Sequence, residues 1–124
     1  MANRPLIAVV DDDDSSRESL EGLFKSVGFD VRAFASAEEF LNWDHIGDAD
    51  CLILDVVMPG MSGIELHRQL LDSHREMPVI FITAHGSAEE MRSTALANGA
   101  RDYLIKPLSE DELLDAIQKA LRSK

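Results

Sequence analysis

Residues 51–63 read CLILDVVMPGMSG. An unbroken apolar run ends in Asp55, and a turn containing Pro and Gly then leads to Ser62. Because the run is short and almost entirely apolar, it is typical of a strand that is buried on both faces of a parallel sheet. We therefore expect Asp55 to stand at the carboxyl end of a middle strand.

Four more short apolar runs accompany this one. The five predicted strands are Leu6–Val10, Val31–Phe34, Cys51–Leu54, Val79–Thr83 and Tyr103–Ile105. The first, third and fourth are nearly continuous in apolar residues, which favours burial on both faces. The second and fifth are more mixed, so we expect one or both of them at an edge.

The segments between the strands have the period of amphipathic helices. Apolar stripes at helical spacing are formed by Leu20, Leu23, Phe24 and Val27 and by Leu113, Leu114, Ile117 and Leu121. A Ser-x-x-Glu capping pattern opens each of the five expected helices, with the pairs Ser15/Glu18, Ser36/Glu39, Ser62/Glu65, Ser87/Glu90 and Ser109/Glu112. Gly28 and Gly99 are suited to left-handed helix ends.

This strict alternation of strand and helix predicts an α/β fold. It implies a doubly wound parallel sheet with right-handed crossovers and helices on both faces. Five strands fit the flavodoxin-like (βα)5 arrangement with strand order 2-1-3-4-5, whereas a closed barrel needs eight. A chain of 124 residues has the usual size of one domain, so we expect a single domain over residues 1–124.

Composition excludes several classes of function. The formal net charge of −11 argues against direct binding of nucleic acid, which relies on clustered Lys and Arg. No apolar run approaches the roughly 18 residues of a membrane helix. The acidic run Asp11–Asp14 leaves no room for the apolar core of a signal peptide, so we expect a cytoplasmic protein. The lone Cys51 is interpreted as a small buried hydrophobe.

Polar residues collect where the predicted strands end. Asp11 and Asp12 follow the first strand, Asp55 follows the third, Thr83 ends the fourth, and Lys106 follows the fifth. Ligands of doubly wound sheets bind outside the carboxyl ends of the strands, so these residues should meet. Two carboxylates about 4 Å apart repel each other by roughly 4 kcal/mol at an effective dielectric of about 20, and a cation relieves that repulsion. We expect a site for Mg²⁺, with Mn²⁺ as a substitute.

The same residue types are suited to phosphoryl transfer. An Asp carboxylate can act as a nucleophile that forms an aspartyl phosphate. Asp55 is the best candidate because it stands alone on the middle strand, between the acidic pair and the side that carries Thr83 and Lys106. Thr83 and Lys106 would bind the phosphoryl oxygens, where fixed charge and hydrogen bonds are most useful.

The chain resembles the response-regulator receiver domains of bacterial two-component systems. The matching stretches are Val9–Asp12, Leu54–Gly63, Thr83–Ala84 and Lys106–Pro107, and the resemblance covers essentially the whole chain. The metal ligands that it implies are Asp12, Asp55 and the Val57 carbonyl directly, with Asp11 acting mainly through water. The phosphoryl contacts that it implies are Thr83, Lys106 and the backbone amides of Val57 and Ala84. It also implies a cis bond between Lys106 and Pro107.

The resemblance further implies a switch and its partners. Tyr103 matches the aromatic switch position of the family, so phosphorylation would draw Thr83 toward the phosphoryl group and turn Tyr103 inward. The fourth helix, fifth strand and fifth helix would then present a changed surface. A sensor histidine kinase would donate the phosphoryl group, and an output domain or a downstream protein would read the surface. Within the family, the chain looks like the receivers of two-domain transcription regulators with a helix-turn-helix output. Homodimerisation on phosphorylation stays open.

The leading hypothesis is a regulatory phosphoacceptor domain that is not an enzyme in its own right. Two other functions compete with it. The pattern Asp11-x-Asp13-x-Ser15 loosely resembles the haloacid-dehalogenase phosphatases and would make Asp11 the nucleophile. An interaction module that works without phosphorylation would need a vestigial acidic pocket.

His67 and His74 lie seven residues apart, a poor spacing for zinc, and are interpreted as surface or boundary residues.

Overall fold

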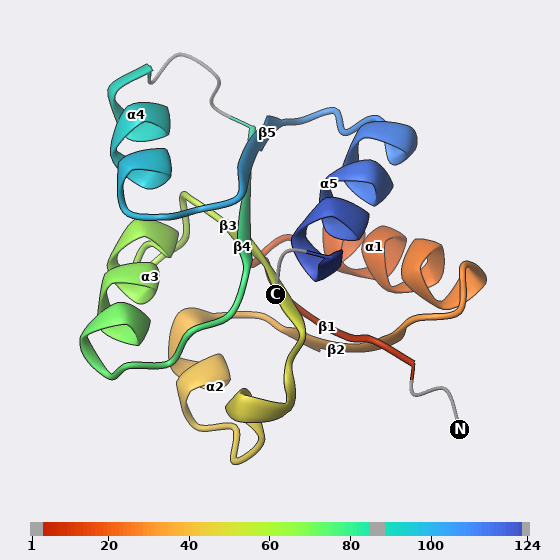
Figure 1. The fold of residues 1–124 in the computed structure, drawn as a ribbon, viewed down its shortest axis with the longest axis horizontal. Helices are drawn as coiled ribbons and strands as arrows, with labels where there is room; N and C mark the ends of the chain where they lie inside the picture. Colours follow the sequence, from red (N-terminus) through yellow and green to blue (C-terminus); the bar gives the residue numbers. More distant parts are fainter. Residues whose placement is uncertain (1–3, 85–88, 123–124) are drawn as a thin grey trace.

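The structure, a computed structural model, describes residues 4–84 and 89–122 of the chain. Strands and helices alternate along it (Figure 1). The elements are β1 (Leu6–Val10), α1 (Asp14–Ser26), β2 (Asp30–Phe34), α2 (Ala37–Leu41), the 3-10 turn η1 (Ile46–Asp48), β3 (Cys51–Asp55), α3 (Gly63–Asp72), β4 (Val79–Thr83), α4 (Glu89–Ala97), β5 (Asp102–Ile105) and α5 (Glu110–Arg122). The predicted alternation of strands and helices is therefore confirmed.

The five strands form one parallel sheet in the order β2-β1-β3-β4-β5, as predicted. Both strands of mixed composition, β2 and β5, lie at the edges. The order changes direction between β1 and β3, where Val10 pairs with Leu54. The residues that follow these two strands are therefore neighbours, although more than forty positions separate them along the chain.

Helices cover both faces of the sheet (Figure 1). Alternate residues of the central strands point to α1 and α5 on one side, in a core that contains Phe24, Ile53 and Ile117. The other residues point to α2, α3 and α4, in a second core that includes Phe40 and Leu66. Cys51 is buried in β3, as expected. In the part of the chain that the structure describes, no helix has the length and apolar character needed to cross a membrane.

Most of the predicted helix caps are present. Ser62 and Glu65 form a reciprocal capping box at the start of α3, with each backbone amide donating to the other side chain at 3.2 Å. Ser36 and Ser109 each accept a hydrogen bond from the backbone amide three residues on. The pattern that begins at Ser87 lies outside the described residues.

The predicted cap of the first helix is wrong. α1 begins at Asp14, and its N-cap is Asp13, whose side chain accepts a hydrogen bond from the Ser15 amide at 3.2 Å. Asp caps a helix as well as Ser does, so the run of aspartates supplies the cap before Ser15 is reached. Ser15 is the second residue of the helix instead.

His67 is more deeply placed than a surface or boundary residue. It is only 4% exposed, and its ring packs edge-on against Phe81 with 5.4 Å between ring centroids. Burial lowers the pKa of His67, which favours the neutral ring. His74, by contrast, lies two residues beyond the end of α3 in a left-handed conformation with φ of 58°.

Candidate functional site

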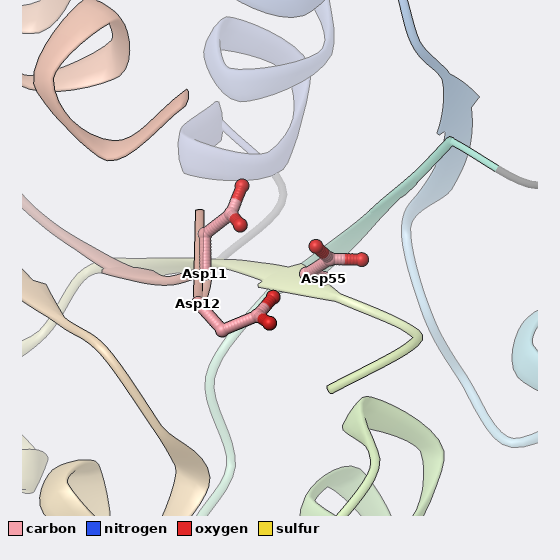
Figure 2. A group of neighbouring side chains, drawn as sticks. All are labelled: Asp11, Asp12 and Asp55. Atoms are coloured by element: carbon pink, nitrogen blue, oxygen red, sulfur yellow. The ribbon is translucent and has the colours of Figure 1, made fainter. Parts of the chain in front are cut away.

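Three carboxyl groups gather at the ends of β1 and β3 (Figure 2). Each of Asp11, Asp12 and Asp55 has a carboxylate oxygen within 4.8 Å of those of the other two. Asp11 is fully buried and Asp55 is 6% exposed, whereas Asp12 lies at the surface. Such a cluster of hard oxygen donors, open to solvent on one side, has the chemistry that Mg²⁺ or Mn²⁺ requires.

Lys106 reaches this cluster from the end of β5. Its Nζ lies 3.0 Å from Asp11 Oδ2 and 3.5 Å from Asp55 Oδ2, and it donates to Ser16 Oγ at 3.2 Å. The bond that follows it, to Pro107, is cis, as the resemblance implied. The predicted meeting of strands one, three and five is thus confirmed in the structure.

The loop after β1 is held by hydrogen bonds between side chains and its backbone. Asp11 Oδ1 accepts a hydrogen bond from the Asp13 amide at 2.9 Å, and Arg17 donates to the Asp11 carbonyl at 2.8 Å. Arg17 also pairs with Asp14. Lys106 donates to the second carboxylate oxygen of Asp11, Oδ2, so both oxygens of this buried side chain have a partner. Asp12 is left as the more accessible carboxylate of the pair.

Burial makes Asp55 an unusual carboxyl group. Desolvation and the neighbouring charge of Asp11 raise its pKa from 3.8 to about 6, and the positive charge of Lys106 offsets only part of this rise. Burial would by itself lower the pKa of Lys106, but hydrogen bonds and charges from Asp11 and Asp55 raise it above its usual value. A negatively charged site of this kind gains free energy when a further cation binds.

The loop between β3 and α3 passes beside Asp55. The Val57 amide donates to Asp55 Oδ1 at 3.3 Å, and the Val57 side chain is 46% exposed. The Val56 amide donates to Ile82 of β4 at 3.0 Å, and Gly63 donates back to the Val56 carbonyl at 2.9 Å. Backbone groups of this loop are therefore presented next to the carboxyl group of Asp55.

Thr83 ends β4 next to this edge of the sheet. It is 1% exposed, and its carbonyl accepts a hydrogen bond from the Lys106 amide at 2.7 Å. Ala84, the next residue, is exposed. Because side chains alternate along a strand, Thr83 lies on the same face of β4 as Phe81, which pairs with Tyr103 of β5. Thr83 thus stands between the carboxyl edge and Tyr103.

Tyr103 points into the core below α4. Its side chain is 3% exposed, and its ring centroid is 6.2 Å from that of Phe81. Its hydroxyl is buried without a hydrogen-bond partner among the described residues, and Arg92 of α4 donates to its carbonyl at 3.3 Å. Tyr103 therefore already occupies the inward position that the resemblance implies for the phosphorylated state.

Three residues of this region were missed in the sequence. Ser16 and Arg17 contact Lys106 and the Asp11 backbone, and Glu38 contacts the loop after β3. Ser16 and Arg17 follow the aspartate run closely enough to be suspected, because the first turn of a helix that starts there must face the site. Glu38 lies 23 positions from its partner, and no local pattern indicates that contact.

Comparison with known proteins agrees with this geometry. A family model described as the response regulator receiver domain matches residues 7–118. The response regulator protein TodT of Pseudomonas putida is 44% identical over 117 residues, which cover 94% of this chain and 51% of TodT. The structure of response regulator StyR is 45% identical with a TM-score of 0.90, and the match covers 98% of this chain and 61% of StyR. The FixJ-N structure is 34% identical with a TM-score of 0.87, and the match covers 99% of this chain and 98% of FixJ-N.

The curated relatives are longer than this chain, so the comparison covers only part of each of them. The chain spans about half the length of the curated relatives it matches, such as TodT and nodulation protein W of Bradyrhizobium diazoefficiens. The comparisons give the haloacid-dehalogenase alternative no support. The burial of Asp11 and its contact with Lys106 also make it a poorly placed nucleophile.

Proposed function

Because the chain belongs to the response regulator receiver domain family, we propose that it is a signalling switch that accepts a phosphoryl group on Asp55. The observation that carries this proposal is the cluster of three carboxyl groups, with Lys106 Nζ 3.5 Å from Asp55. Asp55 faces both the acidic pair and a fixed cation, as a phosphoacceptor must. The role is regulatory, and the domain assists only its own phosphorylation and dephosphorylation.

Asp12, Asp55 and the Val57 carbonyl would hold Mg²⁺ directly, and Asp11 would act mainly through water. The three carboxyl groups fit such an ion because their oxygens already lie within 4.8 Å of one another. Mn²⁺ prefers the same donors and would serve as a substitute. When bound, the ion neutralises negative charge on the carboxylates and on the incoming phosphoryl oxygens.

The phosphoryl group would come from a phosphohistidine of a sensor kinase. A carboxylate oxygen of Asp55 forms a bond to phosphorus while the nitrogen–phosphorus bond breaks. The bonding electron pair leaves with the imidazole nitrogen, which takes a proton from solvent. Lys106, Thr83 and the amides of Val57 and Ala84 would stabilise charge on the transferred oxygens.

Phosphorylation would act on the switch through Thr83. The added charge of about −1.5 to −2 attracts the Thr83 hydroxyl toward the site. This movement opens space on the face of β4 that Thr83 shares with Phe81, and the inward position of Tyr103 is stabilised. The surface formed by α4, β5 and α5 would change, and an output domain or a downstream protein would read it.

The wider setting is also a proposal. We expect the receiver domain to occupy residues 1–124 in the cytoplasm and to control transcription through an attached or separate output domain. A sensor histidine kinase is the expected donor, and homodimerisation on phosphorylation is an arrangement that this surface could support. The net charge of −11 supports an arrangement in which nucleic acid is bound elsewhere.

Incubation with acetyl phosphate tests the proposed function. With Mg²⁺ present, intact-mass measurement should find one labile phosphoryl group per chain, and EDTA should prevent the labelling. The variant Asp13→Ala is the matched control, because it removes an adjacent carboxylate that caps α1 and lies outside the three-carboxyl cluster. Labelling that persists in EDTA, or its loss in Asp13→Ala, would contradict the proposal.

The variant Tyr103→Ala tests the switch. Labelling should be largely intact because the Tyr103 ring packs on Phe81 in the core below α4 and does not belong to the three-carboxyl cluster. The chemical-shift changes that phosphorylation causes at Leu96 and Ile105 should become much smaller than in the wild type, as measured by NMR. Changes of the same size in both proteins would remove the proposed role of the aromatic ring.

A further inference from the structure

The loop that joins β3 to α3, residues 56–62, carries backbone groups on which the proposed function depends. Val57 would offer its carbonyl to Mg²⁺ and its amide to the phosphoryl group. The loop is fixed at its start by the Val56 amide, which donates to Ile82, and at its end by the capping box of Ser62. Pro59 has no amide hydrogen with which to anchor the middle of the loop.

Glu38 supplies an anchor there from a different part of the chain. It lies in the first turn of α2, and its Oε2 accepts a hydrogen bond from the Met61 amide at 3.2 Å. The same oxygen lies against Gly60, where an added Cβ would be only 3.0 Å away. Gly60 has φ of +78°, so the loop turns sharply where the carboxylate meets it. The carboxylate thus holds the backbone at its tightest point.

The hydrogen bond between Glu38 and the Met61 amide lies only a short segment of chain away from the carboxyl cluster. Met61 is four residues after Val57, and Val57 in turn donates to Asp55 Oδ1 at 3.3 Å. A shift of the loop at Met61 would be passed on to the Val57 peptide groups, because the other end of the segment is tied to β4. Replacing a partner that holds a metal ligand directly typically weakens metal binding by about 10- to 100-fold, so a contact four residues from the ligand should have a smaller effect.

From these contacts we propose that Glu38 is a positioning residue for the divalent-ion site. It acts through the Met61 amide and holds the β3–α3 loop so that the Val57 carbonyl faces the cluster of Asp11, Asp12 and Asp55. The inference rests on the proposed function, because it assumes that this cluster binds the ion. Glu38 is exposed, so its replacement should leave the core intact.

Calorimetric titration with Mg²⁺ measures the effect directly. The variant Glu38→Ala should raise the Kd for Mg²⁺ by about three- to tenfold. Glu38→Gln, which keeps an acceptor oxygen, should stay within about twofold of the wild type. Glu39→Ala removes the same charge from the same helix, but its carboxylate contacts the Ala35 amide instead, so it should bind Mg²⁺ normally.

A second readout separates positioning from stability. Labelling by acetyl phosphate should be slow in Glu38→Ala at low Mg²⁺ and recover to within about twofold of the wild-type rate at saturating Mg²⁺. A residue with a merely structural role would lower the melting temperature in EDTA without moving the Mg²⁺ dependence.

The outcomes distinguish the two proposals. If Glu38→Ala binds Mg²⁺ as tightly as the wild type, the role of Glu38 is refuted and the proposed function stands. If Glu38→Gln is as weak as Glu38→Ala, the effect comes from charge, and the hydrogen bond to Met61 is not its cause. If the wild type itself binds no Mg²⁺, both proposals are refuted.

Discussion

Replacing Asp55 by Asn should stabilise the metal-free protein by about 2 to 3 kcal/mol at neutral pH. Burial and the charge of Asp11 raise the pKa of Asp55 from 3.8 to about 6, so the ionised carboxylate is disfavoured in the folded state. A difference of about two pKa units corresponds to about 3 kcal/mol. Asn is similar in shape and carries no charge, so the variant should escape this cost.

The pH dependence of this gain follows from the direction of the shift. Between pH 3.8 and about 6 the folded state binds the Asp55 proton more tightly than the unfolded state does. Wild-type stability should therefore decrease as pH rises through this window, relative to the variant. The difference should be full above about pH 6 and vanish below about pH 3.8, where both states are protonated.

Urea denaturation in EDTA at pH 7 and near pH 4 measures the two free energies of unfolding. Added Mg²⁺ should stabilise the wild type and have little effect on Asp55→Asn, because binding to the folded state adds to its stability. Equal stability of the two proteins at pH 7, or a difference that grows on acidification, would contradict the proposed electrostatics.

Gly63→Ala should destabilise the protein by about 2 to 4 kcal/mol. A Cβ at position 63 would lie 2.1 Å from the Asp55 carbonyl oxygen and 3.1 Å from Val56 Cα. These are backbone atoms of β3 and of the loop beyond it, so they cannot rotate aside as a side chain can. The strand end and α3 would have to separate, and Asp55 would move with them.

Gly22→Ala is a matched control for this variant. Gly22 lies inside α1, and apart from the backbone of its own helix an added Cβ there meets no atom of the described residues within 4 Å. Alanine favours a helix over glycine by roughly 1 kcal/mol, so this variant should be slightly stabilised. Urea denaturation compares the free energies of unfolding, and acetyl phosphate should label Gly63→Ala more slowly than Gly22→Ala. A Gly63→Ala variant as stable as the wild type would show that the close approach costs nothing.

The sequence predicts both ends of every strand to within one residue. Leu6–Val10 is apolar throughout and Val79–Thr83 is apolar up to its last residue, and the structure has these bounds. The alternation of strands and helices then leaves few topologies, since parallel connections must be right-handed. The meeting of Asp11, Asp55 and Lys106 follows from strand order alone, because each stands at a carboxyl end.

Features that depend on competition or on distant contacts were not predicted. The first helix offers both Asp13 and Ser15 as caps, and local patterns do not rank two good caps that lie two residues apart. His67 is polar, yet its ring packs on Phe81, where burial lowers its pKa, and only the tertiary structure shows this contact. The contact of Glu38 with Met61 joins the first turn of α2 to the loop after β3, and the two lie far apart in the sequence.

The most direct test of the account is to locate the phosphoryl group by peptide mapping after reaction with acetyl phosphate and Mg²⁺. We predict a single modified peptide, with the group on Asp55, and no labelling of Asp55→Asn under the same conditions. Modification of Asp11 in the wild type, or full labelling of the Asn variant, would contradict the central claim that the carboxyl ends of β1, β3 and β5 meet to make Asp55 a phosphoacceptor.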